Sequence, residues 1–335
     1  MPMSSPQIPE LKSRSGDLVE RTDIRKFAAG FSGRTSEPGQ SEYERDRRIW
    51  NAAIDKRPGL IAFCANAADV VHAVNFARER DILLAVRSGG HNVAGRAVCD
   101  DGMVIDLSLM KAIAVDPRHR TVCVEAGATL GDVDESTHRQ GLAVPTGVVS
   151  KTGIAGLTLG GGVGWLVRKY GLTCDNVLSF DVVTAQGETI SAGEDTHPDL
   201  FWALRGGGGN FGVVTSFLYR AHAVSTVLGG LIAYPREQAP HVFRQYRAFM
   251  EAAPDELTAY AALLHTPDGV PVVALAVCYC GDVAEGERVL KPLRTLAQPL
   301  MDAIQPMPFP RCKSWLTRLS PMAPAITGSR PSSKS

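Results

Sequence analysis

The first run of residues that could do chemistry is the loop VRSGGHNVAG at positions 86–95. Glycine lets backbone N–H groups approach an anion closely, and a turn rich in such amides can form a phosphate-binding nest. Arg87 adds a positive charge to this loop, Ser88 adds a hydroxyl, and His91 follows two glycines directly. The loop therefore indicates an anion site with a histidine at its mouth. A hydrogen-bonded turn histidine without a chemical role would give the same local pattern.

A second glycine-rich stretch, TGIAGLTLGGGVG, occupies positions 152–164. Flat, large ligands such as an isoalloxazine ring or a dinucleotide need backbone contact without side-chain bulk. Leu157, Leu159 and Val163 alternate with the glycines, which favours a half-buried wall over a flexible linker. A loop-rich surface segment is the alternative. Because glycine is so frequent, we expect residues 145–176 to form loops and turns around a ligand rather than regular elements.

A third cluster contains a literal G-x-G-x-x-G at Gly207, Gly209 and Gly212. The segment before it, at 199–206, predicts a helix, and the segment after it, at 213–221, predicts a strand. A dinucleotide-binding fingerprint needs the opposite context, with a strand before the glycines and a helix after them. The motif therefore does not predict NAD binding.

Other functional classes find no support in the sequence. It has no HExxH, GxSxG or GxxxxGK[ST] motif, and its eight His and seven Cys are dispersed without CxxC spacing, so no metal site is expected. Basic and acidic residues both total 35 and only 7% of residues are aromatic, which argues against nucleic acid and acidic membranes as partners. The opening residues lack a signal-peptide pattern and no apolar run is long enough to span a bilayer, so we expect a cytoplasmic enzyme.

The elements that must position these loops show in the apolar pattern. Strands are expected at 59–63 and 82–86, with a helix at 66–80 between them. This order predicts a parallel pair of strands with a crossover helix. A helix is also expected at 130–140, beginning beside Thr129 as a cap candidate. Further strands are expected at 103–108, 113–117, 121–127, 177–185 and 188–192.

At 335 residues the chain is long enough for two domains. Residues 1–16 are polar and expected to be disordered, and residues 17–53 predict a charge-rich helical segment. The glycine clusters end before residue 226, so we place a domain boundary near 225, between domains at 54–225 and 226–310. The second domain is expected to contain strands at 226–234, 258–266 and 271–280.

The three glycine clusters together resemble one family. R-S-G-G-H, then T-G-I-A-G-L-T-L-G-G-G-x-G-W-L-x-R-K-x-G-L-x-x-D-N, then L-R-G-G-G-G-N-F-G-V-V-T are similar to motifs of vanillyl-alcohol-oxidase-type flavoproteins. The nearest branch is the berberine-bridge-enzyme-like FAD-linked oxidoreductases, and the resemblance covers about residues 45–300. It implies an α+β fold, with a PCMH-type FAD-binding domain of two α/β subdomains and an antiparallel-sheet substrate domain.

The resemblance also implies a cofactor and its contacts. FAD is expected to be attached covalently through His91 at the 8α-methyl group, with the pyrophosphate on residues 87–92. Relatives with a second linkage use a Cys before the second glycine cluster, and this chain has none between Cys123 and Cys174, so a single linkage is expected. The full set of expected cofactor-binding residues is Arg87, Ser88, Gly89, Gly90, His91, Asn92, Gly95, Thr152, Gly153, Gly156, Gly160, Gly161, Gly162, Gly164, Asp175, Asn176, Val177, Asn210, Phe211, Gly212 and Val213.

The implied chemistry is hydride transfer from a C–H bond beside an alcohol or amine group, or on a sugar, to flavin N5, with oxygen as acceptor. The partner is then a small-molecule substrate. Two alternatives are a catalytically inactive flavin-binding remnant and a reductase of related fold with non-covalent flavin.

Family members are longer than this chain, and their C-terminal part supplies an Asn-Tyr motif and often the catalytic base. The last 25 residues here, 311–335, contain no acidic residue and no clear periodicity. We therefore expect an incomplete substrate domain followed by an aberrant, out-of-frame tail. No catalytic base is assigned, because its expected position is missing.

Overall fold

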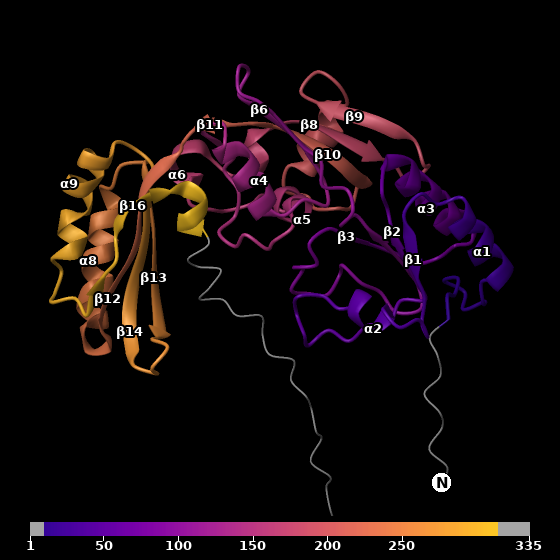
Figure 1. The fold of residues 1–335 in the computed structure, drawn as a ribbon, viewed down its shortest axis with the longest axis horizontal. Coiled ribbons are helices and arrows are strands. Elements are labelled where there is room, and N and C mark those ends of the chain that lie inside the picture. The colour runs from indigo at the N-terminus through magenta and orange to yellow at the C-terminus, as the bar shows by residue number, and fades with distance from the viewer. Residues whose placement is uncertain (1–9, 314–335) are drawn as a thin grey trace, which may run out of the picture.

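The structure is a computed structural model that describes residues 10–313. Figure 1 shows an arch in which the N-terminal half and the segment after residue 225 form opposite limbs. The N-terminal half holds two larger open sheets and one two-stranded sheet, and the other limb holds the third larger sheet. The α+β class expected from the sequence is confirmed. No helix among the described residues is long and apolar enough to cross a membrane.

The first sheet is short and mixed. Its strands run in the order β1-β2-β4-β3, and helix α3 (Ala67–Glu79) connects β2 to β3. Both β2 and β3 pair in parallel with β4, so the expected parallel pair is wrong in one respect: β4 lies between the two strands. Every residue of β4 is buried, which suits the centre of a parallel sheet. The strands are β1 (Arg34–Ser36), β2 (Leu60–Phe63), β3 (Leu84–Arg87) and β4 (Met103–Asp106).

The second sheet is antiparallel, in the order β5-β6-β10-β8-β9. Helix α4 (Leu130–His138) follows β6. Its N-cap is Thr129, as expected, and Thr129 forms a capping box with Asp132. Helix α7 (Pro198–Leu204) precedes β10. The strands are β5 (Ile113–Asp116), β6 (Thr121–Glu125), β8 (Val177–Val183), β9 (Thr189–Gly193) and β10 (Val213–Arg220), with a small pair of β7 (Leu142–Ala143) and β11 (His222–Ala223) beside it.

Two expectations about regular structure are wrong. The glycine-rich block at 145–176 holds helices α5 (Ile154–Leu159) and α6 (Val167–Tyr170) and a 3₁₀ turn, Cys174–Asn176. Helix α5 forms because Ile154, Thr158 and Leu159 are buried, while its internal glycine is exposed.

The N-terminal region also differs from the expectation. The segment 17–53 is only partly helical, with α1 (Arg21–Ala29), strand β1 and the short α2 (Tyr43–Asp46). Order begins before residue 16, since Leu11 is buried and Ser13 forms a β-bridge with Ile82.

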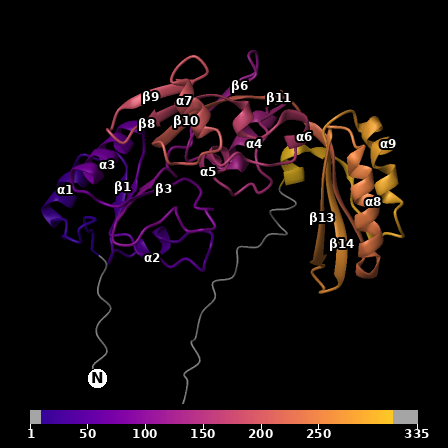
Figure 2. The same ribbon diagram turned by 180° about the vertical axis from the view of Figure 1, so that it is seen from behind.

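The third sheet forms the second limb. Its long strands β12 (Thr226–Pro235), β13 (Leu257–His265) and β14 (Pro271–Tyr279) are antiparallel, and β15 (Met301–Asp302) and β16 (Gln305–Pro308) pair with β12. Helices α8 (Ala239–Glu251) and α9 (Val283–Arg294) cover one face in both views (Figures 1 and 2). A 3₁₀ turn, Arg236–Gln238, leads into α8.

The opposite face of this sheet packs against Trp165 and Leu166 of the N-terminal half. Residues 309–313 are helical, and Cys312 and Lys313 are buried. These include the first three residues of the expected aberrant tail, and the remainder of that tail, 314–335, lies outside the described residues.

Candidate functional site

The first two glycine loops meet by direct backbone contact. A Cβ added to Gly89 would lie 2.3 Å from the backbone nitrogen of Gly153, and a Cβ added to Gly153 would lie 2.3 Å from that of Gly89. No side chain fits between the two segments, so glycine is needed at both positions. Helix α5 begins at this contact, with Gly153 as its N-cap. Gly89 and Gly153, which are 64 residues apart in the sequence, therefore belong to one site.

The loop after β3 presents unpaired backbone donors. Within residues 10–313, the N–H groups of residues 89–92 donate no hydrogen bond. Gly90 adopts a φ of +68°, a left-handed conformation that turns the chain and that glycine adopts freely. Successive free amides in such a turn are donors for an anion such as a phosphate. This is the donor set that the sequence pattern indicates for the pyrophosphate.

Arg87 contributes differently from its expected role. Its side chain is buried, pairs with the buried carboxylate of Asp106 and donates to the Asp46 carbonyl at 2.7 Å. The charge of Arg87 is therefore neutralised inside the protein instead of being offered to a phosphate. Ser88 is similar, because its hydroxyl donates to the Ala126 carbonyl at 2.6 Å. These two side chains hold the loop in place, and the backbone N–H groups of the loop are left to bind an anion.

His91 is half-buried beside the crossing of the two loops. Its ring stacks on Trp50, with ring centroids 5.6 Å apart and planes 16° apart. The Thr152 hydroxyl oxygen lies 3.5 Å from Nδ1. Burial lowers the pKa of His91, and a backbone hydrogen bond to Lys151 opposes this effect. The imidazole is therefore neutral at neutral pH, with a proton on one ring nitrogen and a lone pair on the other.

The second glycine stretch forms a bare wall that starts at the crossing. Gly156 is exposed, and a Cβ there would meet no atom within 4 Å. Gly160 follows one helical turn later and is also exposed, so one side of α5 has no side chain at either position. Gly161 and Gly162 have φ of +105° and +82°, and a Cβ on Gly164 would strike the Thr146 carbonyl oxygen. The backbone is open to a flat ligand on one side and closely packed on the other.

The third cluster joins the second through short contacts. The Gly208 N–H donates to the Leu159 carbonyl at 2.8 Å. Arg205 donates to the Cys174 carbonyl at 3.0 Å and pairs with Asp175 at 3.4 Å. A Cβ on Gly212 would lie 2.8 Å from the Val183 carbonyl oxygen, which places this cluster against β8. Helix α7 precedes this cluster and strand β10 follows it. A dinucleotide-binding fingerprint needs the reverse order.

Asn176 has a side chain that is fully engaged within the protein. Its Nδ2 donates to the Tyr170 and Leu172 carbonyls at 2.9 and 2.8 Å, and its Oδ1 lies 2.7 Å from Nε2 of His222. Tyr170 stacks on His222 with ring centroids 3.9 Å apart. Burial lowers the pKa of His222 to about 4, with the charges of Arg220 and Arg120 as further causes. Asn176 therefore shapes the turn at 170–176 through its side chain.

The remaining expected residues lie at the edges of this region. Asn92 accepts from the Gly95 and Arg96 N–H groups, which closes the end of the first loop. Asn210 donates to the Gly207 carbonyl at 2.8 Å, and the Phe211 side chain is 41% exposed. Val177 and Val213 are buried at the starts of β8 and β10.

Three residues that shape the site carry no signal in the sequence. The ring of Trp50 stacks on His91, and the backbone N–H of Trp50 donates to the Gly90 carbonyl at 3.0 Å. Thr146 packs its carbonyl against Gly164, and His222 holds Asn176. Trp50 and His222 lie outside the glycine motifs, in segments that only the tertiary fold brings close, and Thr146 lies in the block at 145–176 without being singled out there.

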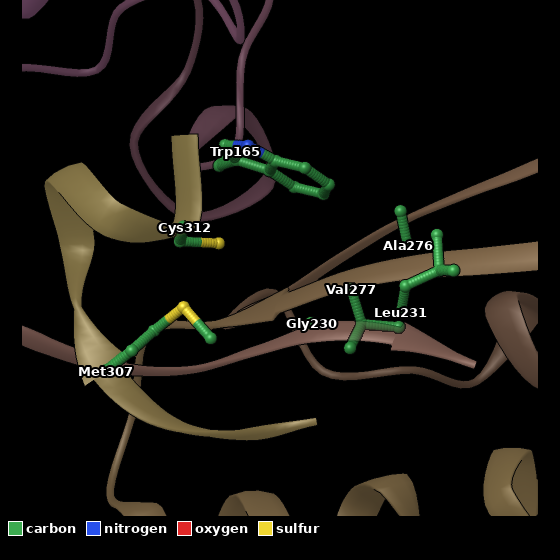
Figure 3. A pocket seen from close by; sticks show the side chains of 7 residues that line it. All are labelled: Trp165, Gly230, Leu231, Ala276, Val277, Met307 and Cys312. Atoms are coloured by element: carbon green, nitrogen blue, oxygen red, sulfur yellow. The ribbon is translucent and has the colours of Figure 1, made fainter. Parts of the chain in front are cut away.

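An apolar pocket lies where the second glycine stretch meets the third sheet (Figure 3). Trp165 extends from the end of the glycine stretch toward Leu231 of β12 and Ala276 of β14. Met307 and Cys312 close the other side. Among the described residues, no group of His, Cys, Asp or Glu has the arrangement of a metal site.

The site fits FAD on its own geometry. Four adjacent amides without partners suit a pyrophosphate, and the glycine wall leaves room for a flat ring where a Cβ would intrude. Residues 58–193 match the family described as FAD binding domain, so FAD is the cofactor of this domain, as expected.

Comparisons with known proteins agree with this assignment. An FAD-linked oxidoreductase of Dictyostelium discoideum is 36% identical over 289 residues, which cover 85% of this chain and 62% of that protein. The structure of 6-hydroxy-D-nicotine oxidase from Arthrobacter nicotinovorans matches with a TM-score of 0.84 at 32% identity, over 88% of this chain and 66% of that one. Xylooligosaccharide oxidase from Myceliophthora thermophila matches with a TM-score of 0.77 at 26% identity, over 88% and 63%.

The chain thus spans less than two thirds of the length of these relatives. The matched part covers most of this chain. On this evidence the chain belongs to the FAD-linked oxidoreductases that carry the FAD binding domain.

Proposed function

We propose that this chain binds FAD covalently through His91 and uses it to oxidise a small molecule at a C–H bond beside an alcohol or amine group, or on a sugar. The observation that carries the proposal is the position of His91, half-buried where the two glycine loops cross and next to four free amides. A residue that anchors a cofactor needs to lie beside the groups that bind it, and His91 does.

The protein's own residues prepare His91 for bond formation. Burial favours the neutral imidazole, and the hydrogen bond to Lys151 helps to fix which nitrogen keeps its proton. Trp50 covers one face of the ring, which limits its rotation. A neutral, oriented imidazole has a lone pair for a covalent bond, whereas an imidazolium has none.

The bound flavin would supply hydride acceptance. The chain's contribution is to hold the phosphates on the backbone of residues 89–92 and to keep side chains away from the ring at Gly156 and Gly160. Two of the relatives named above are oxidases, one named for 6-hydroxy-D-nicotine and one for xylooligosaccharides, which supports amine-type and sugar substrates with oxygen as acceptor.

Acid precipitation tests the covalent bond. We expect the washed pellet of the wild-type chain to remain yellow and to contain one flavinylated peptide that includes His91. In His91→Ala all flavin should move to the supernatant, although the native variant should still bind some FAD through the free amides. His119→Ala is the matched control, because His119 is exposed and pairs with Asp116, away from the glycine loops. A colourless wild-type pellet would refute covalent attachment.

Substrate oxidation requires a separate measurement. The flavin absorbance of the purified chain should bleach under anaerobic conditions on mixing with a substrate and return when oxygen is admitted. Amines, alcohols and oligosaccharides would be compared in this assay. If the covalent flavin is present and no compound of these classes bleaches it, the chain is a flavin-binding protein without this oxidation activity.

A further inference from the structure

Two buried cysteines face each other between the third sheet and the segment that follows β16. Cys278 lies on the central strand β14, and Cys312 lies in the helical residues 309–313. Their exposed fractions are 0% and 3%. Both belong to the hydrophobic cluster on the sheet face that packs against Trp165.

The strand register shows how close the two thiols are. Gly229 of β12 is the cross-strand partner of Cys278. A Cβ built on Gly229 would lie 2.8 Å from Sγ and 3.5 Å from Cβ of Cys312. Opposite Cβ atoms in an antiparallel pair are about 4.5–5.5 Å apart. Cys312 thus occupies the space left by the missing side chain of Gly229, and its thiol interacts with that of Cys278.

A disulfide needs its two Cβ atoms to lie about 3.5–4.5 Å apart, and both cysteines lie beside the empty side-chain position of Gly229. The chain between Cys278 and Cys312 contains a turn, helix α9 and two short strands. It is therefore long enough for the two cysteines to meet. A modest shift of residues 309–313 toward β14 would complete the geometry. Gly229 leaves the route between the two sulfur atoms open.

We propose that Cys278 and Cys312 form a reversible thiol–disulfide site that fastens the segment 309–313 to strand β14. The oxidant is a peroxide. One sulfur attacks a peroxide oxygen, the O–O bond breaks, and a sulfenic acid and water form. The second sulfur then displaces the sulfenic oxygen, which leaves as a second water. Two thiols and one hydrogen peroxide thus give one disulfide and two waters.

Access to this site is restricted, because both thiols are buried. Cys312 lines the small apolar pocket beside Trp165, the side from which a peroxide would approach (Figure 3). The contact with Cys312 and burial together hold the pKa of Cys278 well above its usual range. Because the thiolate is the reacting form, oxidation should be slow at neutral pH and faster at alkaline pH.

The test is peptide mapping of the full chain under non-reducing conditions after treatment with hydrogen peroxide. We expect a peptide pair joined through Cys278 and Cys312 that disappears on reduction with dithiothreitol. The oxidised chain should unfold at a higher temperature than the reduced chain, because the bond restricts the unfolded state.

Variants make the assignment specific. Cys312→Ser should abolish the joined peptide and the thermal shift. Cys280→Ser should leave both unchanged, and it is the matched control because Cys280 lies next to the end of the same strand, two residues after Cys278. A bond through Cys280, or oxidation that stops at sulfinic acid on separate peptides, would overturn the proposal. The wild-type map decides the question even if a serine variant fails to fold, and it does not depend on FAD.

Discussion

The contact between Gly89 and Gly153 gives glycine two different roles in one site. At Gly153 the added Cβ would collide with the backbone of Gly89, and backbone cannot move aside as a flexible side chain can. At Gly156, three residues later, the space is open. The first glycine therefore permits the fold, and the second keeps the surface bare for a ligand.

These roles predict that a change from glycine to alanine has different effects at the two positions. Gly153→Ala should lower the free energy of unfolding by about 3 kcal/mol, because an overpacked backbone contact has no room to relax. Gly156→Ala should not destabilise the protein, since alanine favours a helix over glycine, but it should weaken FAD binding. Urea unfolding of the flavin-free chain and FAD titration separate the two effects. Equal loss of stability in both variants would contradict this division of roles.

The pair formed by His222 and Asn176 predicts a dependence on pH. The pKa of His222 is lowered to about 4, below the value of about 6.5 for an unfolded chain. The unfolded chain therefore takes up a proton first, and stability should fall as pH drops from about 6.5 toward 4. Because His222 is half-buried, we expect a loss of no more than about 2 kcal/mol.

Unfolding of wild type and of His222→Gln across this pH interval measures the effect. The glutamine can still donate to Asn176 and does not titrate, so its stability should change less than that of wild type as pH falls. A parallel decline of both proteins would show that other groups cause it.

At the residue scale, the glycine loops that the sequence singled out lie together in the structure, whereas the contacts of the side chains around them were not predictable. The glycine loops are local signals, since glycine at fixed spacing reports where the backbone must turn or approach something closely. Arg87 was expected to face a phosphate and instead pairs with Asp106, nineteen residues away on the neighbouring strand. Such a pairing depends on strand register and not on local spacing.

At the scale of elements, apolar pattern predicted most strands and the long helices, because burial on one side leaves a period in the sequence. It did not predict α5, a helix of six residues that includes Gly156. That helix is stabilised by its contacts with the rest of the fold, such as the buried hydrogen bond between the hydroxyl groups of Thr158 and Tyr219 at 2.7 Å. The position of β4 between β2 and β3 likewise depends on contacts across the sheet.

Helix α4 offers a test at this scale, because its start was predictable from one residue. Thr129 accepts from the Asp132 N–H, and Asp132 accepts from the Thr129 N–H in return. Thr129→Ala removes half of this capping box and should cost about 1 kcal/mol of stability. Thr129→Ser keeps the hydroxyl and should retain most of the stability that the capping box contributes. Urea unfolding of the three proteins measures the difference, and equal losses in both variants would indicate that the methyl group of Thr129 is what matters.

At the scale of the whole molecule, the expected family, the α+β class and the FAD cofactor are confirmed, and the two limbs are joined by more than the chain at residue 225. Lys313, from the segment after β16, pairs with Asp134 of helix α4 at 2.6 Å and donates to the Thr146 hydroxyl. Both charged side chains are buried, with exposed fractions of 0% and 3%. Burial raises the pKa of Asp134, and the charge of Lys313 opposes that shift.

Removal of one partner should therefore be costly, and the cost should depend on pH. Lys313→Met leaves a buried carboxylate without its cation and should destabilise the chain by about 3–5 kcal/mol. The pKa of Asp134 then rises further, so the folded variant holds a proton that the unfolded chain has lost. Its stability is retained at low pH and falls as pH rises through the raised pKa. Urea unfolding at about pH 5 and about pH 8 should show a larger defect at the higher pH, and Asp134→Asn combined with Lys313→Met should remove that pH dependence. A defect of equal size at both pH values would mean that Lys313 acts by packing, without pairing its charge with Asp134.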